Sequence, residues 1–329
     1  MTDAALSAEE HRPAEPAVLD DVPGWFWDHD RHLFEWFLAR QEKAGVTGDL
    51  LEMGAYLGRS AIVIGSHLQP TETFTVCDLF DSDAPDDENA AEMDMSYRKT
   101  LTRSAFEDNY LAFHPSLPEI IQATTSSLAG GRIPAGAFRF IHIDASHLYE
   151  HVVGDLQVAR AALQPQGVVV LDDYRSAHTP GVAAATWEAV FNHGLKPIVL
   201  TECKFYGTWG DPEPAQRDLL DRIGLAEGCQ LSTETLNGQQ VLRITGNSEG
   251  IEAFRPSRHH DRLAAAAARR ETEEARREAL RAQEAAAEDL AVRRARAAER
   301  RRPANVAKRV AGDLLPPVVT DAIRRARRG

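Results

Sequence analysis

Residues 49–60 read DLLEMGAYLGRS, and this stretch decides the fold of the chain. Its first part is a short apolar run typical of a buried strand, and Gly54 and Gly58 follow at once. Two glycines at this spacing permit a tight turn with close backbone approach. Residues 60–68, SAIVIGSHL, then favour a helix. A strand, a glycine turn and a helix in this order are how a nucleotide-type cofactor site begins.

The glycine spacing differs from the G-x-G-x-x-G loop of dinucleotide-binding proteins, which has a third glycine. A second apolar run, residues 73–77, ends next to Asp78. An NAD-dependent oxidoreductase shares a sheet of this kind and an acid after its second strand. This class is therefore an open alternative on these residues alone.

Composition and charge limit the classes of partner. The 329 residues are 43% hydrophobic, enough for one full core with appended elements. The net charge of -13 is uneven, since residues 261–329 hold 18 Lys and Arg against 11 Asp and Glu, while the rest holds 19 against 39. Because binding a phosphate backbone needs clustered cations, the acidic body argues against nucleic acid and favours small molecules and metal cations.

The cysteines and the N-terminal residues indicate the cellular compartment of the protein. Cys77, Cys203 and Cys229 form no CxxC pair and match no zinc spacing, which predicts reduced thiols. The first residues show neither the basic nor the apolar region of a signal peptide, and no stretch reaches the length of a membrane-spanning helix. The sequence predicts a cytoplasmic protein.

We expect an α/β fold with a doubly wound, mostly parallel, seven-stranded sheet. Apolar runs alternate with helical segments through the middle of the chain, and the seven strand candidates are 50–53, 73–77, 119–122, 138–143, 167–171, 197–200 and 240–244. The predicted parts are a disordered leader (1–22), an N-terminal helix (23–47), the α/β domain (48–250), a charged helix (251–302) and a basic tail (303–329).

The C-terminal extension is rich in Ala, Arg and Glu, which favour a long exposed helix. Leucines occur in it only at Leu263, Leu280 and Leu290, so a strong heptad seam is missing and a coiled coil stays an open hypothesis. The tail after residue 302 mixes apolar clusters with a basic end. Two hypotheses stay open for it. The tail is solvated, or it contacts an anionic membrane surface or an acidic partner.

An acidic constellation follows two neighbouring strand candidates. Asp144 ends the run FRFIHID with His147 three residues later, and Asp172 and Asp173 end the run GVVVLDDY. Strand ends of a parallel sheet meet at one edge, so these groups can converge. Three carboxylates repel one another, and a hard divalent cation such as Mg²⁺ relieves the repulsion better than Zn²⁺. Helix capping or pairing with arginines is the alternative.

The imidazole of His147 suits a general base beside such a metal, because it titrates near neutral pH. An iron site of two histidines and a carboxylate would need a second histidine, and His142 is a weak candidate for it. Aromatic side chains that could line an acceptor pocket are Trp25, Trp27, Tyr174, Tyr206 and Trp209.

Taken together, these residues resemble the class I S-adenosylmethionine-dependent methyltransferases, and among them the metal-dependent O-methyltransferases. LLEMGAYLGRSA resembles the first motif of the catechol and caffeoyl-CoA type. IDASHLYEHVVGDLQVARAALQPQGVVVLDDY resembles the macrocin O-methyltransferase-like branch, which methylates sugar hydroxyls on natural products. The resemblance covers about residues 45–246.

The resemblance implies a Rossmann-like methyltransferase fold with S-adenosylmethionine and Mg²⁺ as cofactors and a hydroxyl group, of a sugar on a natural product or glycan, as acceptor. Carried over by position, His147 and Asp144 are catalytic. Asp144, Asp172 and Asp173 hold Mg²⁺. The implied cofactor-binding residues are Glu52, Gly54, Tyr56, Gly58 and Ser60 around the methionine part, Asp78 on the ribose, and Thr125 and Ser126 near adenine.

A non-catalytic scaffold that uses the charged tail to gather partners is a second alternative. It predicts loss of the acids or of the glycines, and this sequence keeps both. Homo-oligomerisation is left open by the sequence.

Overall fold

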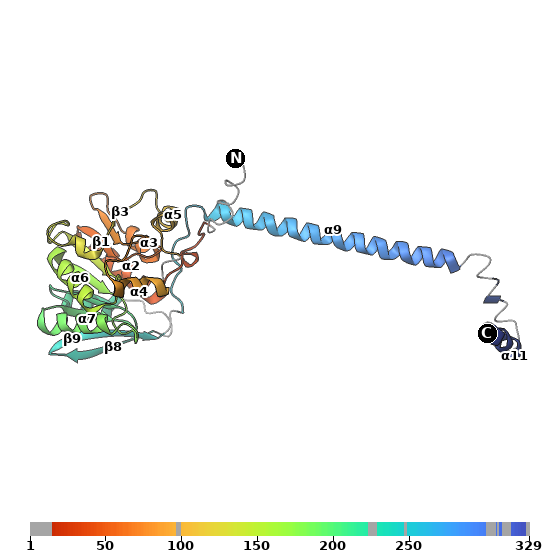
Figure 1. The fold of residues 1–329 in the computed structure, drawn as a ribbon. Helices are drawn as coiled ribbons and strands as arrows, with labels where there is room; N and C mark the ends of the chain where they lie inside the picture. The colour runs from red at the N-terminus through yellow and green to blue at the C-terminus, as the bar shows by residue number, and fades with distance from the viewer. Residues whose placement is uncertain are drawn as a thin grey trace. The chain divides into compact units, whose positions relative to one another are not determined.

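The computed structural model describes residues 15–96, 100–222, 229–246, 249–300, 307, 309–310 and 317–326. The chain divides into two compact units, Met1–Asp261 and Arg262–Gly329. The first unit holds the predicted α/β domain (Figure 1), and the second consists of C-terminal helices.

The first unit is built on one sheet of nine strands within the described residues, in the order β3-β2-β1-β4-β5-β7-β6-β9-β8. Strand order reverses between β1 and β4, which is where ligands bind in open α/β sheets. The strands are β1 (Asp49–Met53), β2 (Phe74–Asp78), β3 (Glu119–Gln122), β4 (Phe138–Ile143), β5 (Leu163–Leu171), β6 (Lys196–Leu200), β7 (Phe205–Thr208), β8 (Cys229–Leu236) and β9 (Gln239–Gly246).

The α/β fold and the seven predicted strands are confirmed, but the count of seven is corrected to nine. The sequence reading missed β7, which pairs antiparallel with both β5 and β6, and β8, which pairs antiparallel with β9. Strand β7 is short and follows β6 through a tight turn. Strand β8 alternates exposed polar residues, so it lacks the continuous apolar run of a central strand.

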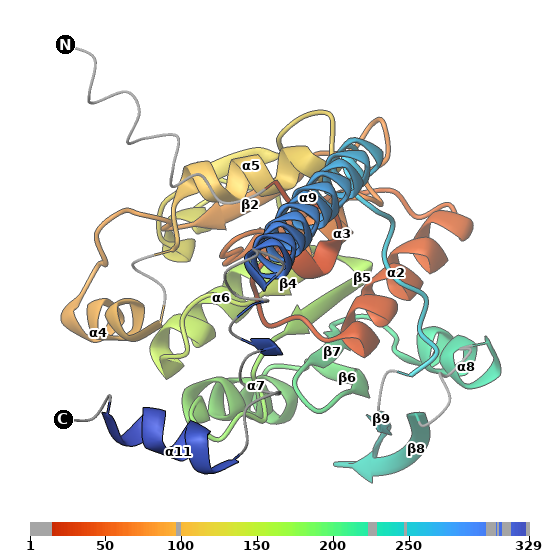
Figure 2. The same ribbon diagram turned by 90° about the vertical axis from the view of Figure 1, so that its right-hand side faces the viewer.

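Helices cover both faces of the sheet because alternate strand residues point to opposite sides. Leu50 packs in one apolar layer with α2 (Asp28–Lys43), α3 (Arg59–Gly65), α5 (Arg103–Phe113) and α8 (Glu213–Arg222). Leu51 packs in the other layer with α6 (Tyr149–Ala162) and α7 (Pro180–Asn192). Figure 2 shows α6 and α7 on one side of the strands, with α2, α3 and α5 on the other.

The packed part of the N-terminal region begins earlier than the sequence predicted. A short 3-10 helix, η1 (Leu19–Asp21), precedes α2, and Leu19 and Val22 are buried in the core. The prediction that residues 1–22 form a disordered leader is therefore wrong for residues 19–22, which pack on the domain. Residues 1–14 lie outside the described residues.

The acidic segment that follows β2 contains α4 (Asp87–Ser96), whose residues Asn89 and Met93 are buried. Both side chains line a cavity described below, so this segment covers part of the site.

Residues 249–259 are not helical, although a helix from residue 251 was predicted, and they run across the first unit as a strap. The Ser257 amide donates to the Ala17 carbonyl, the Arg258 amide donates to the Ala112 carbonyl, and Phe254 contacts Phe113. The helix proper begins after this strap.

The second unit is described by itself. Helix α9 (His260–Arg300) has no buried residue, and Leu280 and Leu290 are exposed. A second helix, α11 (Pro317–Ala326), ends in Arg324 and Arg325. Of the helices that the structure describes, none combines the length and apolar character needed to cross a membrane.

Candidate active site

The glycine loop after β1 brings the chain against the end of β4. Gly54 has a φ of 84°, and a Cβ placed there would lie 2.1 Å from the Asp144 carbonyl oxygen. Gly58, with a φ of 93°, precedes the first residue of α3 and lies against the Phe106 ring. Tyr56 between them also has a positive φ, of 48°. The turn therefore needs glycine for both its conformation and its close approach.

Substitution of Gly54 tests this close approach. We expect Gly54→Ala to lower the free energy of unfolding by roughly 3 kcal/mol or more, because it adds a backbone clash to an unfavourable φ. Gly45→Ala is the matched control, since Gly45 also has a positive φ but open space around it. It should lose only about 1 kcal/mol. Equal losses in urea unfolding of the two variants would show that the contact with Asp144 is unimportant.

Asp78 holds the glycine loop in place. Its Oδ2 accepts hydrogen bonds from the amides of Ala55 (2.7 Å) and Tyr56 (3.1 Å), and its Oδ1 accepts one from the Phe80 amide (2.6 Å). Burial raises the pKa of the Asp78 carboxyl, and these amides oppose the rise. The predicted ribose contact stays a prediction. The observed contacts show that this acid also builds the loop.

A cavity of about 680 Å³ opens over the ends of β1, β2 and β4. Of the predicted cofactor-binding residues, those that line it are Gly54, Tyr56, Asp78, Thr125 and Ser126. The volume lies in the range of cofactor pockets. Its lining combines apolar side chains with the polar groups of Asp78, Thr125 and Ser126. The residues present therefore fit a nucleotide-type cofactor such as S-adenosylmethionine.

Glu52 and Ser60 are brought together, but away from this cavity. Ser60 Oγ donates to Glu52 Oε1, and the Nδ1 atom of His142 lies 3.0 Å from the same oxygen. Glu52 is fully buried, and burial raises its pKa to about 8 from an ordinary 4.5. Its predicted contact with the methionine part stays a prediction. Ser60 lines a second, smaller cavity instead.

The raised pKa of Glu52 links stability to pH. The folded protein keeps the Glu52 proton up to about pH 8, whereas the unfolded chain releases it near 4.5, so this group's stabilisation falls as pH rises through that window. Glu52→Gln lacks this titration. Relative to the variant, we expect the wild type to lose stability between about pH 5 and pH 8, at up to about 1.4 kcal/mol per pH unit. A pH-independent difference in urea unfolding would contradict the shift.

The second cavity, of about 360 Å³, contains the acidic constellation. Trp25, Phe26 and Trp27 also line it, together with His178. The two tryptophans were expected at an acceptor pocket, whereas Tyr174 and Tyr206 are buried in the core and Trp209 packs against it. The two cavities share three residues, which are Trp25, Tyr56 and Asp144.

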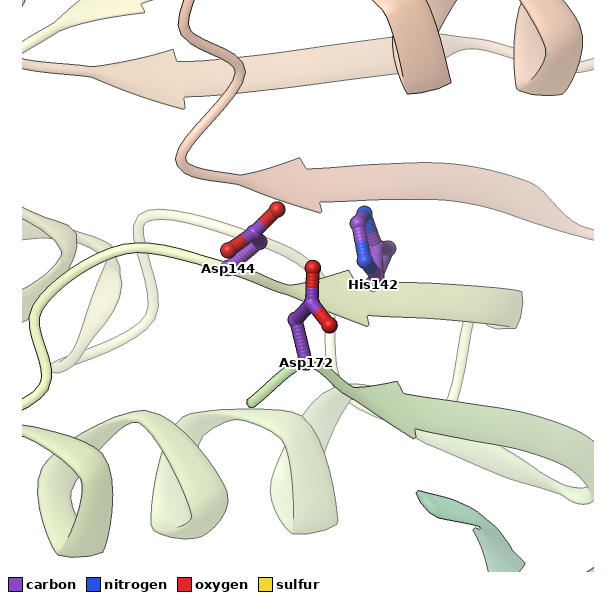
Figure 3. A group of neighbouring side chains, drawn as sticks. All are labelled: His142, Asp144 and Asp172. Atoms are coloured by element: carbon purple, nitrogen blue, oxygen red, sulfur yellow. The ribbon is translucent and has the colours of Figure 1, made fainter. Parts of the chain in front are cut away.

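Asp144 lies close to each of the other two predicted acids, but among the described residues no group of neighbouring ligand atoms holds Asp144, Asp172 and Asp173 together. Asp144 follows β4 and Asp172 follows β5, and Figure 3 shows their carboxylates pointing into the same space, with His142 beside them. One ligand atom each of Asp144, His147 and Asp173 lies within 4.8 Å of the others, as do those of His142, Asp144 and Asp172. Burial, and then the charges of Asp172 and Asp173, raise the pKa of Asp144 well above its ordinary value. A proton or a cation relieves this repulsion.

Lys204 is a site residue that the sequence analysis missed. It precedes β7, is almost fully buried, and places its Nζ 2.5 Å from Asp172 Oδ2 and 3.2 Å from His142 Nε2. The same ammonium lies over the rings of Phe26 and Phe34. The neighbouring acids outweigh the effect of burial and raise its pKa, so it stays charged. A lysine directly before an apolar strand was the signal available in the sequence.

Lys204 also fixes the state of His142. Because an ammonium only donates, His142 Nε2 must accept, and its Nδ1 then carries the hydrogen that is donated to Glu52. Burial, and then the charge of Lys204, lower the pKa of His142 well below its ordinary value, so the ring is neutral. Both ring nitrogens are thus used, which disfavours His142 as an iron ligand.

His147 lies at the wall of the smaller cavity, where its Nε2 is 3.3 Å from Asp173 Oδ2. Asp173 has a positive φ of 56° and accepts a hydrogen bond from Ser176 Oγ. Burial alone would raise the pKa of Asp173, but the bonds from His147 and Ser176 outweigh it and lower the pKa to about 2. An ionised Asp173 therefore orients the imidazole.

The acidic side chains around the Lys204 ammonium outnumber it. Asp30, Asp144, Asp172 and Asp173 all interact with the single ammonium of Lys204. Burial, chiefly, raises the pKa of Asp30, whose carboxylate accepts from the Tyr206 hydroxyl at 2.8 Å. One ammonium can neutralise only one of these four carboxyl groups. Hard oxygen donors fit a divalent cation such as Mg²⁺, which Asp144 would hold together with Asp172 or with Asp173.

Residues 51–174 match the family model described as "Methyltransferase domain". No curated protein matches the chain.

Several solved structures are similar at low identity. The O-methyltransferase NovP is 18% identical, with 55% of this chain and 79% of that chain covered and a TM-score of 0.44. CalS11, a TDP-rhamnose 3'-O-methyltransferase of calicheamicin biosynthesis, is 17% identical over 56% of this chain and 82% of that one, with a TM-score of 0.37. The methyltransferase PaMTH1 of Podospora anserina, bound to S-adenosylhomocysteine, is 14% identical over 64% and 89%, with a TM-score of 0.39.

The assignment rests on the family model, because it covers β1 to the end of β5 and so includes both the glycine loop and the acids. Residues 51–174 form a methyltransferase domain, and the chain is a methyltransferase.

Proposed function

We propose that this enzyme is a Mg²⁺-dependent O-methyltransferase whose acceptor is a hydroxyl group, on a sugar of a natural product or glycan. The observation that carries the proposal is the shared wall of the two cavities. Asp144 borders both the larger, cofactor-type cavity and the smaller cavity with the acids. A methyl group that moves from a cofactor in the larger cavity to an acceptor in the smaller cavity would pass Asp144.

The larger cavity would bind S-adenosylmethionine, whose sulfonium methyl is already electrophilic. The enzyme's task is then to make the acceptor hydroxyl nucleophilic and to align it with that methyl. His147, oriented by Asp173, would accept the hydroxyl proton at a ring nitrogen. A divalent cation held by Asp144, Asp172 and Asp173 would supply Lewis-acid stabilisation of the developing negative charge.

The aromatic side chains of the smaller cavity support a sugar-bearing acceptor. Trp25 and Trp27 are 62% and 55% exposed, which is unusual for residues of this size, and both border the cavity. Sugar rings pack their apolar faces against aromatic rings. Nothing in the described residues or in the comparisons favours an oxidoreductase or a scaffold.

Calorimetric titration tests whether the protein binds the cofactor, and an acceptor screen tests whether turnover needs the metal. We expect S-adenosylhomocysteine to bind in the micromolar range or tighter and NAD to show no binding. Turnover of glycosylated hydroxyl acceptors should stop on chelation and return with Mg²⁺. Turnover that survives complete chelation would overturn the metal part while leaving the methyltransferase in place.

The partners and location of the protein are further proposals. We propose a cytoplasmic enzyme that binds no nucleic acid and whose basic C-terminal residues contact an anionic membrane or an acidic partner. Vesicle co-sedimentation that is unchanged by deletion of residues 303–329 would reject the membrane contact. Light scattering of the purified chain would decide between a monomer and a homo-oligomer.

A further inference from the structure

Five consecutive residues of the N-terminal region, 23–27, form one wall of the smaller cavity, and all of them line it. They connect η1 to α2 and belong to no helix or strand. The exposed Trp25 and Trp27 stand on either side of the buried Phe26. Because no backbone ladder holds such a segment, the side chains around it decide where the two tryptophans lie.

Arg59, the first residue of α3, joins that helix to the segment and lines the same cavity. Its Nη1 atom donates to the Gly24 carbonyl oxygen at 3.1 Å, and its Nη2 atom forms an ion pair with Asp20 of η1. A Cβ placed on Gly24 would lie 3.4 Å from the Arg59 Cβ, so the glycine backbone packs on the arginine side chain. We call this pair of contacts the Arg59 clasp.

The Arg59 clasp acts one residue before Trp25. The Trp25 ring lies 5.5 Å from the Tyr56 ring, and both residues border both cavities. At the other end of the segment, the Trp27 side chain is hydrogen-bonded to the side chain of Cys203, which also lines the smaller cavity. The position of the tryptophans therefore depends on side chains that lie far from them in the sequence.

The two contacts of the clasp differ in their exposure. The Asp20 side chain is 76% exposed, whereas the Arg59 side chain is 20% exposed. An ion pair with one exposed partner contributes little to global stability, because water solvates and screens it. Loss of the clasp should therefore release the segment locally and leave the domain folded.

We propose that Arg59 is a positioning residue for the acceptor, because its clasp holds Trp25 and Trp27 where they pack against the acceptor's sugar ring. This inference rests on the proposed function, in which the smaller cavity binds the acceptor. Ordering a loose loop at the moment of binding costs conformational entropy, and a wall that is ordered beforehand avoids that cost. Arg59 lines the smaller cavity and not the larger one, so it sets the affinity for the acceptor and not that for the cofactor.

The experiment measures two properties of the full-length protein in the presence of S-adenosylhomocysteine and Mg²⁺. Hydrogen exchange reports the opening of residues 22–27, and fluorescence titration reports the affinity for a set of 4-methylumbelliferyl hexosides. In Arg59→Met the segment should exchange about 10-fold faster. The affinity for the tightest-binding hexoside should fall about 10-fold, while that for S-adenosylhomocysteine stays within about two-fold.

Two further variants separate the clasp from a general loss of charge. Asp20→Ala removes one contact of the clasp from a residue that lines neither cavity, and it should lower the hexoside affinity in the same direction by about three-fold. Arg40→Met is the matched control. Arg40 also joins two elements through an ion pair, with Asp218 at 2.7 Å, is 27% exposed and lines neither cavity. It should leave both measurements unchanged.

Each outcome supports or overturns a definite step. Unchanged hydrogen exchange in Arg59→Met overturns the clasp, and faster exchange with unchanged hexoside affinity overturns its role in acceptor binding. Both results leave the proposed function in place. A wild type that binds S-adenosylhomocysteine but none of the hexosides overturns the proposed sugar acceptor and the inference with it.

Parallel changes in Arg59→Met and Asp20→Ala, with Arg40→Met behaving as the wild type, support the inference. If Arg59→Met does not fold, as judged by its thermal melt, Asp20→Ala takes its place, since its side chain is exposed.

Discussion

Replacement of Asp144 by asparagine should lower turnover on the order of 1,000-fold while leaving the affinity for S-adenosylhomocysteine within a few-fold. Asp144 borders both cavities, and the amide keeps its shape but removes the charge that would hold a divalent cation beside the acceptor. The measurement pairs turnover with a glycosylated acceptor and direct titration of Mn²⁺, whose binding should weaken in parallel.

Asp144 is a cleaner test than Asp172, because Asp172→Asn would also leave the Lys204 ammonium without its 2.5 Å partner. Asp211→Asn serves as control, since Asp211 accepts a hydrogen bond from the Glu213 amide at the start of α8, outside both cavities. Full turnover in Asp144→Asn would refute the role of this acid. A parallel loss of S-adenosylhomocysteine binding would instead place Asp144 in the cofactor site alone.

Replacement of Lys204 by methionine should reduce the free energy of unfolding by about 3 to 5 kcal/mol, the usual effect of breaking a buried ion pair from one side. The methionine fills similar space but leaves Asp172 buried without its counter-charge and His142 without its donor. Urea unfolding at neutral pH measures the loss. Saturating Mg²⁺ should restore more stability to this variant than to the wild type, because a cation at the acids replaces part of the missing charge.

A double-mutant cycle separates the ion pair from the loss of packing. The double variant Lys204→Met, Asp172→Asn should be less destabilised than the sum of its single variants, because it no longer buries an unpaired charge. Additive losses, or a Lys204→Met protein as stable as the wild type, would show that the pair contributes little.

The sequence could predict the acids but not their counter-charge. Asp144, Asp172 and Asp173 each end an apolar run, and in a parallel sheet adjacent runs end at the same edge. Their convergence therefore followed from local pattern. Lys204 lies one residue before β7, an antiparallel strand inserted between β5 and β6, and that pairing is a tertiary contact with no periodic signal in the sequence.

The placement of Glu52 shows a signal that was present and not used. Strand side chains alternate, so Glu52 must share the side of Leu50 and not that of Leu51 and Met53. That side is the layer packed by α3, where Glu52 meets Ser60. The resemblance to the first methyltransferase motif predicted that Glu52 contacts the cofactor. The alternation of side chains along the strand instead indicates that Glu52 lies in the core.

The strap of residues 249–259 has a practical consequence for anyone shortening this protein. The last strand ends at Gly246, which invites a cut there. Downstream of it, however, the Glu252 carbonyl accepts from Arg31, and the Ser257 and Arg258 amides bond to the opening segment and to α5. A truncation at residue 250 would remove most of the strap and these contacts. The apolar layer beneath it would lose part of its cover, so the shortened protein should be prone to aggregation and proteolysis. A truncation at residue 261 keeps the strap, lacks all but the first two residues of the 41-residue helix α9, and should survive limited trypsin digestion.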